Sequence, residues 1–89
     1  MEYQYTPLLS DDKHLVTNET FEAAAYIANK IPLHKSTWYE GEAYFVFERD
    51  DVLNEAEHQY LEGRLRGNLH EHARQYQLLI KRIRRMNQE

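Results

Sequence analysis

The decapeptide EGEAYFVFER, residues 40–49, is the most informative stretch of this chain. Its middle is an unbroken run of small, aromatic and aliphatic side chains, a composition typical of a β-strand. Successive side chains of a strand point to opposite faces of the sheet. The two expected sets are Ala43, Phe45 and Phe47 on one face and Tyr44 and Val46 on the other. Because both faces are apolar, we expect helices to cover the side that carries Phe45 and Phe47.

A β-hairpin is predicted to contain this strand. Glu40 and Gly41 supply turn residues between Tyr39 and Glu42, and residues 33–39 follow the two-residue period of a strand. The alternation separates Leu33, Thr37 and Tyr39 from His34, Ser36 and Trp38. We expect Trp38 to share a sheet face with Tyr44 and Val46.

A helix is predicted before the hairpin, with Thr17 or Asn18 as its N-cap and Pro32 as its end. Apolar residues recur there at helical spacing and form one expected inward face: Phe21, Ala24, Ala25, Ala28 and Ile31. A short strand is expected at residues 14–16. Residues 1–13, which lack helical periodicity, are expected to form an extended arm.

Two further helices are predicted after the hairpin. The first begins at Asp50 or Asp51 and ends near Gly63, with Leu53, Ala56, Tyr60 and Leu61 facing inward. The second covers residues 69–87, and Asn68 with Glu71 forms a pair of the capping-box type at its start. Its expected apolar stripe is Leu69, Ala73, Tyr76, Ile80 and Ile83, widened by Leu79 and Met86.

The predicted fold is therefore α+β, a small single domain in the order (β)-α-β-β-α-α with an antiparallel hairpin packed on helices. The domain is expected to cover residues 14–89, after the arm at 1–13. A chain of 89 residues buries only about 60–65% of its unfolded surface, so its core must be thin.

Four segments of the chain resemble a short family of phage and bacterial proteins catalogued only as a domain of unknown function. They are an alanine-rich helix (TNETFEAAAYIANKI), a hairpin that ends YFVFE, a helix that ends YLEG and a closing amphipathic helix (ARQYQLLIKRI). Leu61 stands where the family favours tryptophan, and Leu69 after Asn68 replaces an opening proline. The resemblance implies a compact α+β domain, often encoded by mobile elements, and brings no catalytic residue.

The distribution of charge is uneven. Residues 1–63 hold 13 acidic and 4 basic side chains, a net charge of −9, whereas residues 64–89 hold 7 basic and 2 acidic ones, a net charge of +5. The sequence contains no cysteine, no apolar run long enough to span a bilayer and no basic start followed by an apolar stretch. We expect a cytoplasmic protein without disulfides or cysteine metal sites.

The aromatic strand suggests two kinds of contact surface. Against the strand of the RNA-recognition motif it matches at Gly41, Ala43, Tyr44 and Phe47, but Glu40 and Glu42 occupy the two places that would contact RNA. The strand is therefore expected to build structure. Two alternatives stay open for its other face: partly exposed aromatic residues without a role, or a contact patch of Trp38, Tyr44 and Val46 for a protein partner or a second copy of the chain.

The last helix suggests a nucleic-acid surface. The segment KRIRR places four positive charges within two turns, and the expected phosphate-contacting residues are Arg74, Lys81, Arg82, Arg84 and Arg85. The alternative is a solvated helix end, because basic residues in the last turn complement the helix dipole.

Catalytic and metal sites are not expected. Glu55 with His58, and His70 with His72, have spacings that occur in metal sites, but neither pair is repeated or shares a face with further ligands. The two serines lack a glycine-flanked turn, and no glycine-rich phosphate loop exists. We therefore predict a non-enzymatic binding or regulatory protein without a cofactor. It is expected to act on a protein partner, such as a host nucleic-acid enzyme that it inhibits, with nucleic-acid binding as the alternative.

Overall fold

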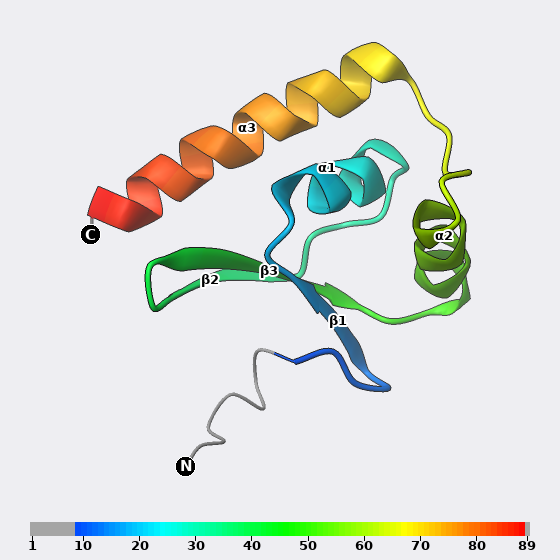
Figure 1. Ribbon diagram of the computed structural model, residues 1–89, viewed down its shortest axis with the longest axis horizontal. Helices are drawn as coiled ribbons and strands as arrows, with labels where there is room; N and C mark the ends of the chain where they lie inside the picture. Colours follow the sequence, from blue (N-terminus) through cyan, green and yellow to red (C-terminus); the bar gives the residue numbers. More distant parts are fainter. Residues whose placement is uncertain (1–8, 89) are drawn as a thin grey trace.

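A computed structural model describes residues 9–88 of the chain (Figure 1). Its elements follow in the order β1 (His14–Thr17), α1 (Thr20–Ala28), β2 (Lys35–Tyr39), β3 (Glu42–Glu48), α2 (Asp51–Leu61) and α3 (Leu69–Gln88). The predicted α+β class and the order β-α-β-β-α-α are confirmed. Residues 1–8 of the expected arm lie outside the described residues.

The three strands form one antiparallel sheet in the order β1-β3-β2, so the aromatic strand is the central one. The turn of the hairpin is Glu40–Gly41, as predicted, and both residues have positive φ angles, 49° and 82°. That pair of angles matches a type I′ turn, whose twist suits the two strands that it joins. A two-residue turn fixes the register: Tyr39 pairs with Glu42, Trp38 with Ala43 and Ser36 with Phe45.

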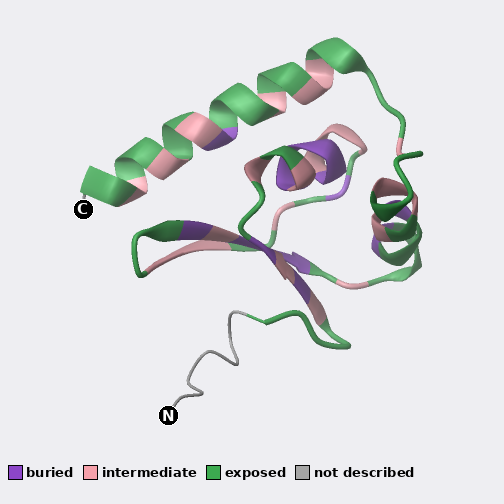
Figure 2. Ribbon diagram, viewed as in Figure 1, coloured by how far each residue is buried: buried purple, intermediate pink, exposed green. Residues whose placement is uncertain are grey.

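The core lies between one face of the sheet and the helices (Figures 1 and 2). Phe45 and Phe47 from β3 are fully buried there, as expected, together with Leu15 of β1. Tyr26 of α1 is also fully buried, and its ring meets the edge of Phe47 at a centroid distance of 5.5 Å. In Figure 1, α1 lies between the sheet and α3, which explains why a helix so rich in alanine is buried on more than one side.

The predicted bounds and inward face of α1 are partly wrong. The N-cap is Glu19, because Thr17 belongs to β1 and its Oγ1 accepts a hydrogen bond from the Glu19 backbone N–H at 3.0 Å. The helix ends at Ala28, since Lys30 has a φ of 72° in the left-handed region, and Ile31 enters the core from the loop. Phe21 is 55% exposed and packs on the ring of His72 instead, with their centroids 4.3 Å apart.

The predicted helix starts after the hairpin are confirmed. The Asp50 carboxylate accepts from the Leu53 N–H at 2.8 Å, and the Asn68 side chain accepts from the Glu71 N–H at 2.9 Å. Leu53 and Ala56 are buried as expected, and Tyr60 packs against the core, but Leu61 is 73% exposed.

The predicted stripe of α3 is confirmed at Leu79, Ile83 and Met86 and wrong at its start. Leu69 is 83% exposed and Ala73 is exposed, whereas Leu79 is the buried residue of the helix among those described. The observed inward line has the 4-3-4-3 spacing of a core-facing helix: His72, Tyr76, Leu79, Ile83 and Met86. Leu69 would continue this spacing, three positions before His72, but it is the first residue of α3 and lines an open hollow instead of the core.

Candidate functional site

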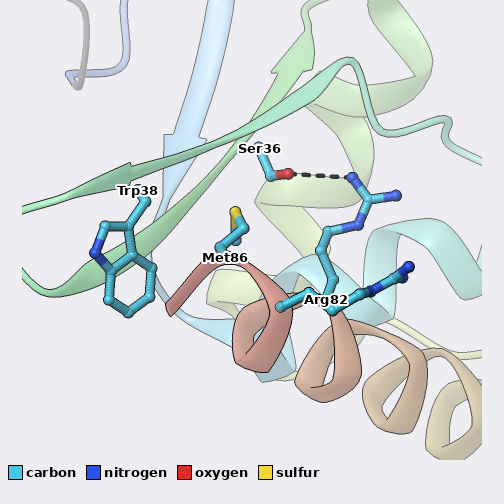
Figure 3. Close-up of a pocket in the computed structure, with 5 residues that line it drawn as sticks. Ser36, Trp38, Arg82 and Met86 are labelled. Atoms are coloured by element: carbon cyan, nitrogen blue, oxygen red, sulfur yellow. Dashed lines mark hydrogen bonds between the residues drawn. The ribbon is translucent and has the colours of Figure 1, made fainter. Parts of the chain in front are cut away.

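An open hollow of about 420 Å³ lies between β2 and the C-terminal half of α3. Its lining residues are Ser36, Trp38, Arg82, Arg85 and Met86 (Figure 3). The two from β2 are two positions apart and so point to the same face of the strand. On α3, Arg85 and Met86 follow Arg82 by three and four positions, so the three residues lie on one side of the helix.

The position of β2 in the sheet leaves this hollow accessible. Among the strands of residues 9–88, β2 lies at an edge of the sheet, and no described strand closes the space beside it. A hydrogen bond joins its two walls, because Arg82 Nη1 donates to the Ser36 hydroxyl oxygen at 3.1 Å (Figure 3). The Arg82 side chain is therefore held across the hollow, while Trp38 lies at the other end of the lining (Figure 3).

The C-terminal half of α3 carries an uncompensated positive charge. Within residues 9–88, no ion pair involves Lys81, Arg82, Arg84 or Arg85. Arg74, nearer the start of the helix, differs because its Nη1 lies 3.2 Å from the Glu71 carboxylate. Unpaired guanidinium groups beside an open hollow attract anions, and Arg presents planar donors that fit a phosphate.

The predicted patch of Trp38, Tyr44 and Val46 is not one surface. Trp38 is the cross-strand partner of Ala43, so it lies on the core face of the sheet, opposite to Tyr44 and Val46. Val46 is only 3% exposed, which leaves it little area for a partner. Tyr44 is half-buried on the face away from the helices. The grouping is wrong because the two-residue turn pairs residue 38 with residue 43.

The five basic residues predicted to contact phosphate lie on different sides of α3. Arg82 and Arg85 line the hollow with Trp38, whereas Lys81 and Arg84 are exposed on α3 outside that lining. Arg74 lines a different hollow, near the end of α1. Two residues of the site, Ser36 and Met86, had not been predicted as contacts. Met86 stands four positions after Arg82, and that spacing was the available signal.

Within residues 9–88, neither histidine pair with metal-site spacing gathers three potential ligands. His58 Nε2 lies 3.0 Å from the Glu62 carboxylate, Glu55 accepts from the Gln59 amide, and His72 lies against the Phe21 backbone oxygen. The one group of three potential ligands within the described residues consists of His14, His34 and Glu48. Its members are 20 and 14 positions apart in the sequence, so local spacing gave no sign of it.

The chemistry that the lining offers is binding. An indole face stacks on planar rings, two guanidinium groups hold anions, and a thioether packs against apolar edges. The five lining side chains include no carboxylate or imidazole that would serve as a general base.

Comparisons of this chain with protein-family models, with curated proteins and with solved structures found no match. The resemblance to the phage and bacterial family therefore stays a prediction. Within residues 9–88, none of the helices is both long enough and apolar enough to cross a membrane.

Proposed function

We propose that this protein is a non-enzymatic binding protein that holds single-stranded nucleic acid in the hollow between β2 and α3. The observation that carries the proposal is that Trp38, Arg82 and Arg85 line one open space. Single-strand binders combine an aromatic side chain that stacks a base with cations that follow the backbone. Stacking contributes about 1–3 kcal/mol per base, and it needs a base that is free of its duplex.

The charge distribution supports contact on this side of the molecule. The C-terminal 26 residues have a net charge of +5 and the rest of the chain −9, so phosphates are attracted to α3 and repelled elsewhere. A single strand that enters beside β2 would meet Arg82 and Arg85 first. Lys81 and Arg84 extend the positive surface around the helix.

The experiment is a titration of labelled single-stranded DNA and RNA, and of the matching duplexes, at 50 mM and 200 mM salt. For single strands, the slope of log K against log salt is about −0.7 for each neutralised phosphate. Affinity is therefore expected to fall about 7-fold between the two salt concentrations if two phosphates are neutralised, and about 50-fold if four are. Trp38 is the only tryptophan, so base stacking is expected to quench the intrinsic fluorescence of the protein.

Two variants with the same change of charge provide the matched comparison. Arg85→Gln removes a charge from the hollow, whereas Arg66→Gln removes one from the exposed connection before α3. Arg85→Gln is expected to reduce the salt slope by about 0.7 and Arg66→Gln to leave it unchanged. Equal effects of the two, or no binding at 50 mM salt, would contradict the proposal.

Binding of a protein partner is the second candidate function, and a different surface now favours it. A hollow of about 340 Å³ between α1 and the connection from α2 to α3 is lined in part by Phe21 and Leu69, which are 55% and 83% exposed. An apolar pair of this kind suits a protein partner, a second copy of the chain or a host nucleic-acid enzyme that is inhibited. Leu69→Glu is expected to abolish self-association in sedimentation measurements if the partner is a second copy.

The cellular setting is part of the same proposal. The resemblance to phage and bacterial proteins supports a mobile-element origin. The absence of cysteine supports a cytoplasmic location, where disulfides are rare.

A further inference from the structure

Two imidazoles and a carboxylate meet at one end of the sheet. His14 is the first residue of β1, Glu48 is the last of β3, and His34 directly precedes β2. Each offers one potential ligand atom, and these three atoms lie within 4.8 Å of one another. The two rings have centroids 5.8 Å apart, and His34 Nδ1 is 3.8 Å from a Glu48 oxygen.

The backbone explains why these three side chains gather. His14 and Glu48 are direct partners across β1 and β3, so they lie side by side on the same face. On the other side of β3, the Val46 carbonyl accepts from the His34 N–H at 2.9 Å, although the register partner of Val46 is Lys35. His34, which precedes β2, and Lys35 thus both lie opposite Val46, the two-against-one pattern of a β-bulge at the end of the strand. Bulges turn a side chain from its regular direction, and here the ring of His34 comes next to that of His14.

We propose that His14, His34 and Glu48 bind one divalent transition-metal ion, with Zn²⁺ as the best fit. Two imidazole nitrogens and one carboxylate oxygen are a ligand set that Zn²⁺ takes, with a fourth position left for water. Zinc–ligand bonds of about 2.0–2.2 Å require the ligand atoms to lie about 3.4 Å apart, closer than the 3.8 Å between His34 Nδ1 and the Glu48 oxygen. The side chains are free to close this gap, since those of His34 and Glu48 are 40% and 71% exposed.

A second carboxylate, that of Asp11, lies next to His14. Asp11 Oδ1 lies 3.8 Å from His14 Nδ1 and accepts hydrogen bonds from the backbone N–H groups of Lys13 and His14 at 2.8 and 2.7 Å. A carboxylate beside one nitrogen of a ligating histidine orients the ring and strengthens the other nitrogen as a donor.

An ion at this site would tie all three strands together. β1 and β2 do not pair with each other, because β3 separates them. A bound ion with ligands from β1, β3 and the start of β2 links both outer strands across the central one. Metal binding would therefore stabilise the fold and raise its melting temperature.

The test uses the untagged full chain, freed of metal, with ZnCl₂ followed by calorimetry and CoCl₂ followed by visible absorption. One equivalent of Zn²⁺ is expected to bind and to raise the melting temperature, and Co²⁺ is expected to give the absorption bands of a four-coordinate site. His34→Gln is expected to weaken binding by about tenfold or more, because it removes a ligand. His34 lies outside the strands and is partly exposed, so this change leaves the core intact.

His58→Gln is the matched control, because it removes an exposed histidine that also lies beside a carboxylate, on α2. It is expected to leave the zinc affinity and the cobalt spectrum unchanged. The proposal fails if the wild-type protein takes up no stoichiometric Zn²⁺ at millimolar concentration. It also fails if His34→Gln and His58→Gln bind the metal equally well.

Discussion

Replacing Tyr26 by phenylalanine tests the network that fixes α1 to the sheet. The hydroxyl of Tyr26 donates to Glu22 Oε2 at 2.5 Å, and Thr17 Oγ1 donates to Glu22 Oε1 at 2.9 Å. The same Thr17 oxygen accepts from the Glu19 backbone N–H. One carboxylate therefore joins the end of β1, the first turn of α1 and the centre of the core.

The expected cost follows from what the substitution removes. Tyr26 is fully buried, and its ring contacts Phe47 and Tyr60 at centroid distances of 5.5 and 5.9 Å, so phenylalanine keeps the packing. What is lost is one hydrogen bond to a charged group, a contribution of about 1.5–3 kcal/mol. A loss of about 2 kcal/mol corresponds to a decrease of about 8–16 °C in Tm for a domain of this size. Small domains have a total stability of about 5–15 kcal/mol, so the effect is large.

The assay is urea unfolding followed by Trp38 fluorescence and by circular dichroism, with the free energy of unfolding compared between variants. Tyr76→Phe is the matched control: its hydroxyl makes no hydrogen bond within residues 9–88 and its side chain is 36% exposed. It is expected to change stability by less than about 0.5 kcal/mol. If Tyr26→Phe lowers the free energy of unfolding by no more than the control does, the hydrogen bond to Glu22 does not stabilise the fold as argued.

Three further outcomes are expected from local structure. Asp50→Ala removes the acceptor for the Leu53 N–H at the start of α2 and should cost about 1 kcal/mol in the free energy of unfolding, measured by urea titration. Gly41→Ala places a side chain at a φ of 82° and should cost about 1 kcal/mol in the same titration, although a Cβ there would meet no atom within 4 Å. Burial, and then the hydrogen bond to Glu22, raise the pKa of the Tyr26 hydroxyl, so this group loses its proton at a lower pH in the unfolded chain than in the folded one. The free energy of unfolding should therefore fall as the pH rises above about 10. Measurements of Tm against pH should show a less steep fall in Tyr26→Phe.

The features that sequence patterns predicted are those with local causes. The alternation in β3, the Glu40–Gly41 turn and the caps Asp50 and Asn68 each depend on residues a few positions apart, and each is confirmed. Errors arose where a helix face depended on its neighbours. Phe21 has the spacing of a core residue, but α1 lies between the sheet and α3, and its buried residues are three alanines and Tyr26.

The face occupied by Trp38 was wrongly predicted, although the sequence contains the information. A turn of two residues makes Tyr39 and Glu42 partners, and counting outward pairs Trp38 with Ala43 on the core side. The group of His14, His34 and Glu48 contains no such local signal. It depends on β1 pairing with a strand that begins 25 residues after β1 ends, and on an irregularity at the start of β2.

The central place of β3 also sets the order in which the chain can assemble. Within residues 9–88, β1 pairs with β3 alone, and its first residue, His14, pairs with Glu48 at the far end of that strand. The hairpin closes a loop of two residues, whereas β1 must close one of more than twenty, which costs more chain entropy. During synthesis β1 emerges before the hairpin, so it waits for its β3 partner, and the hairpin forms the template on which β1 docks.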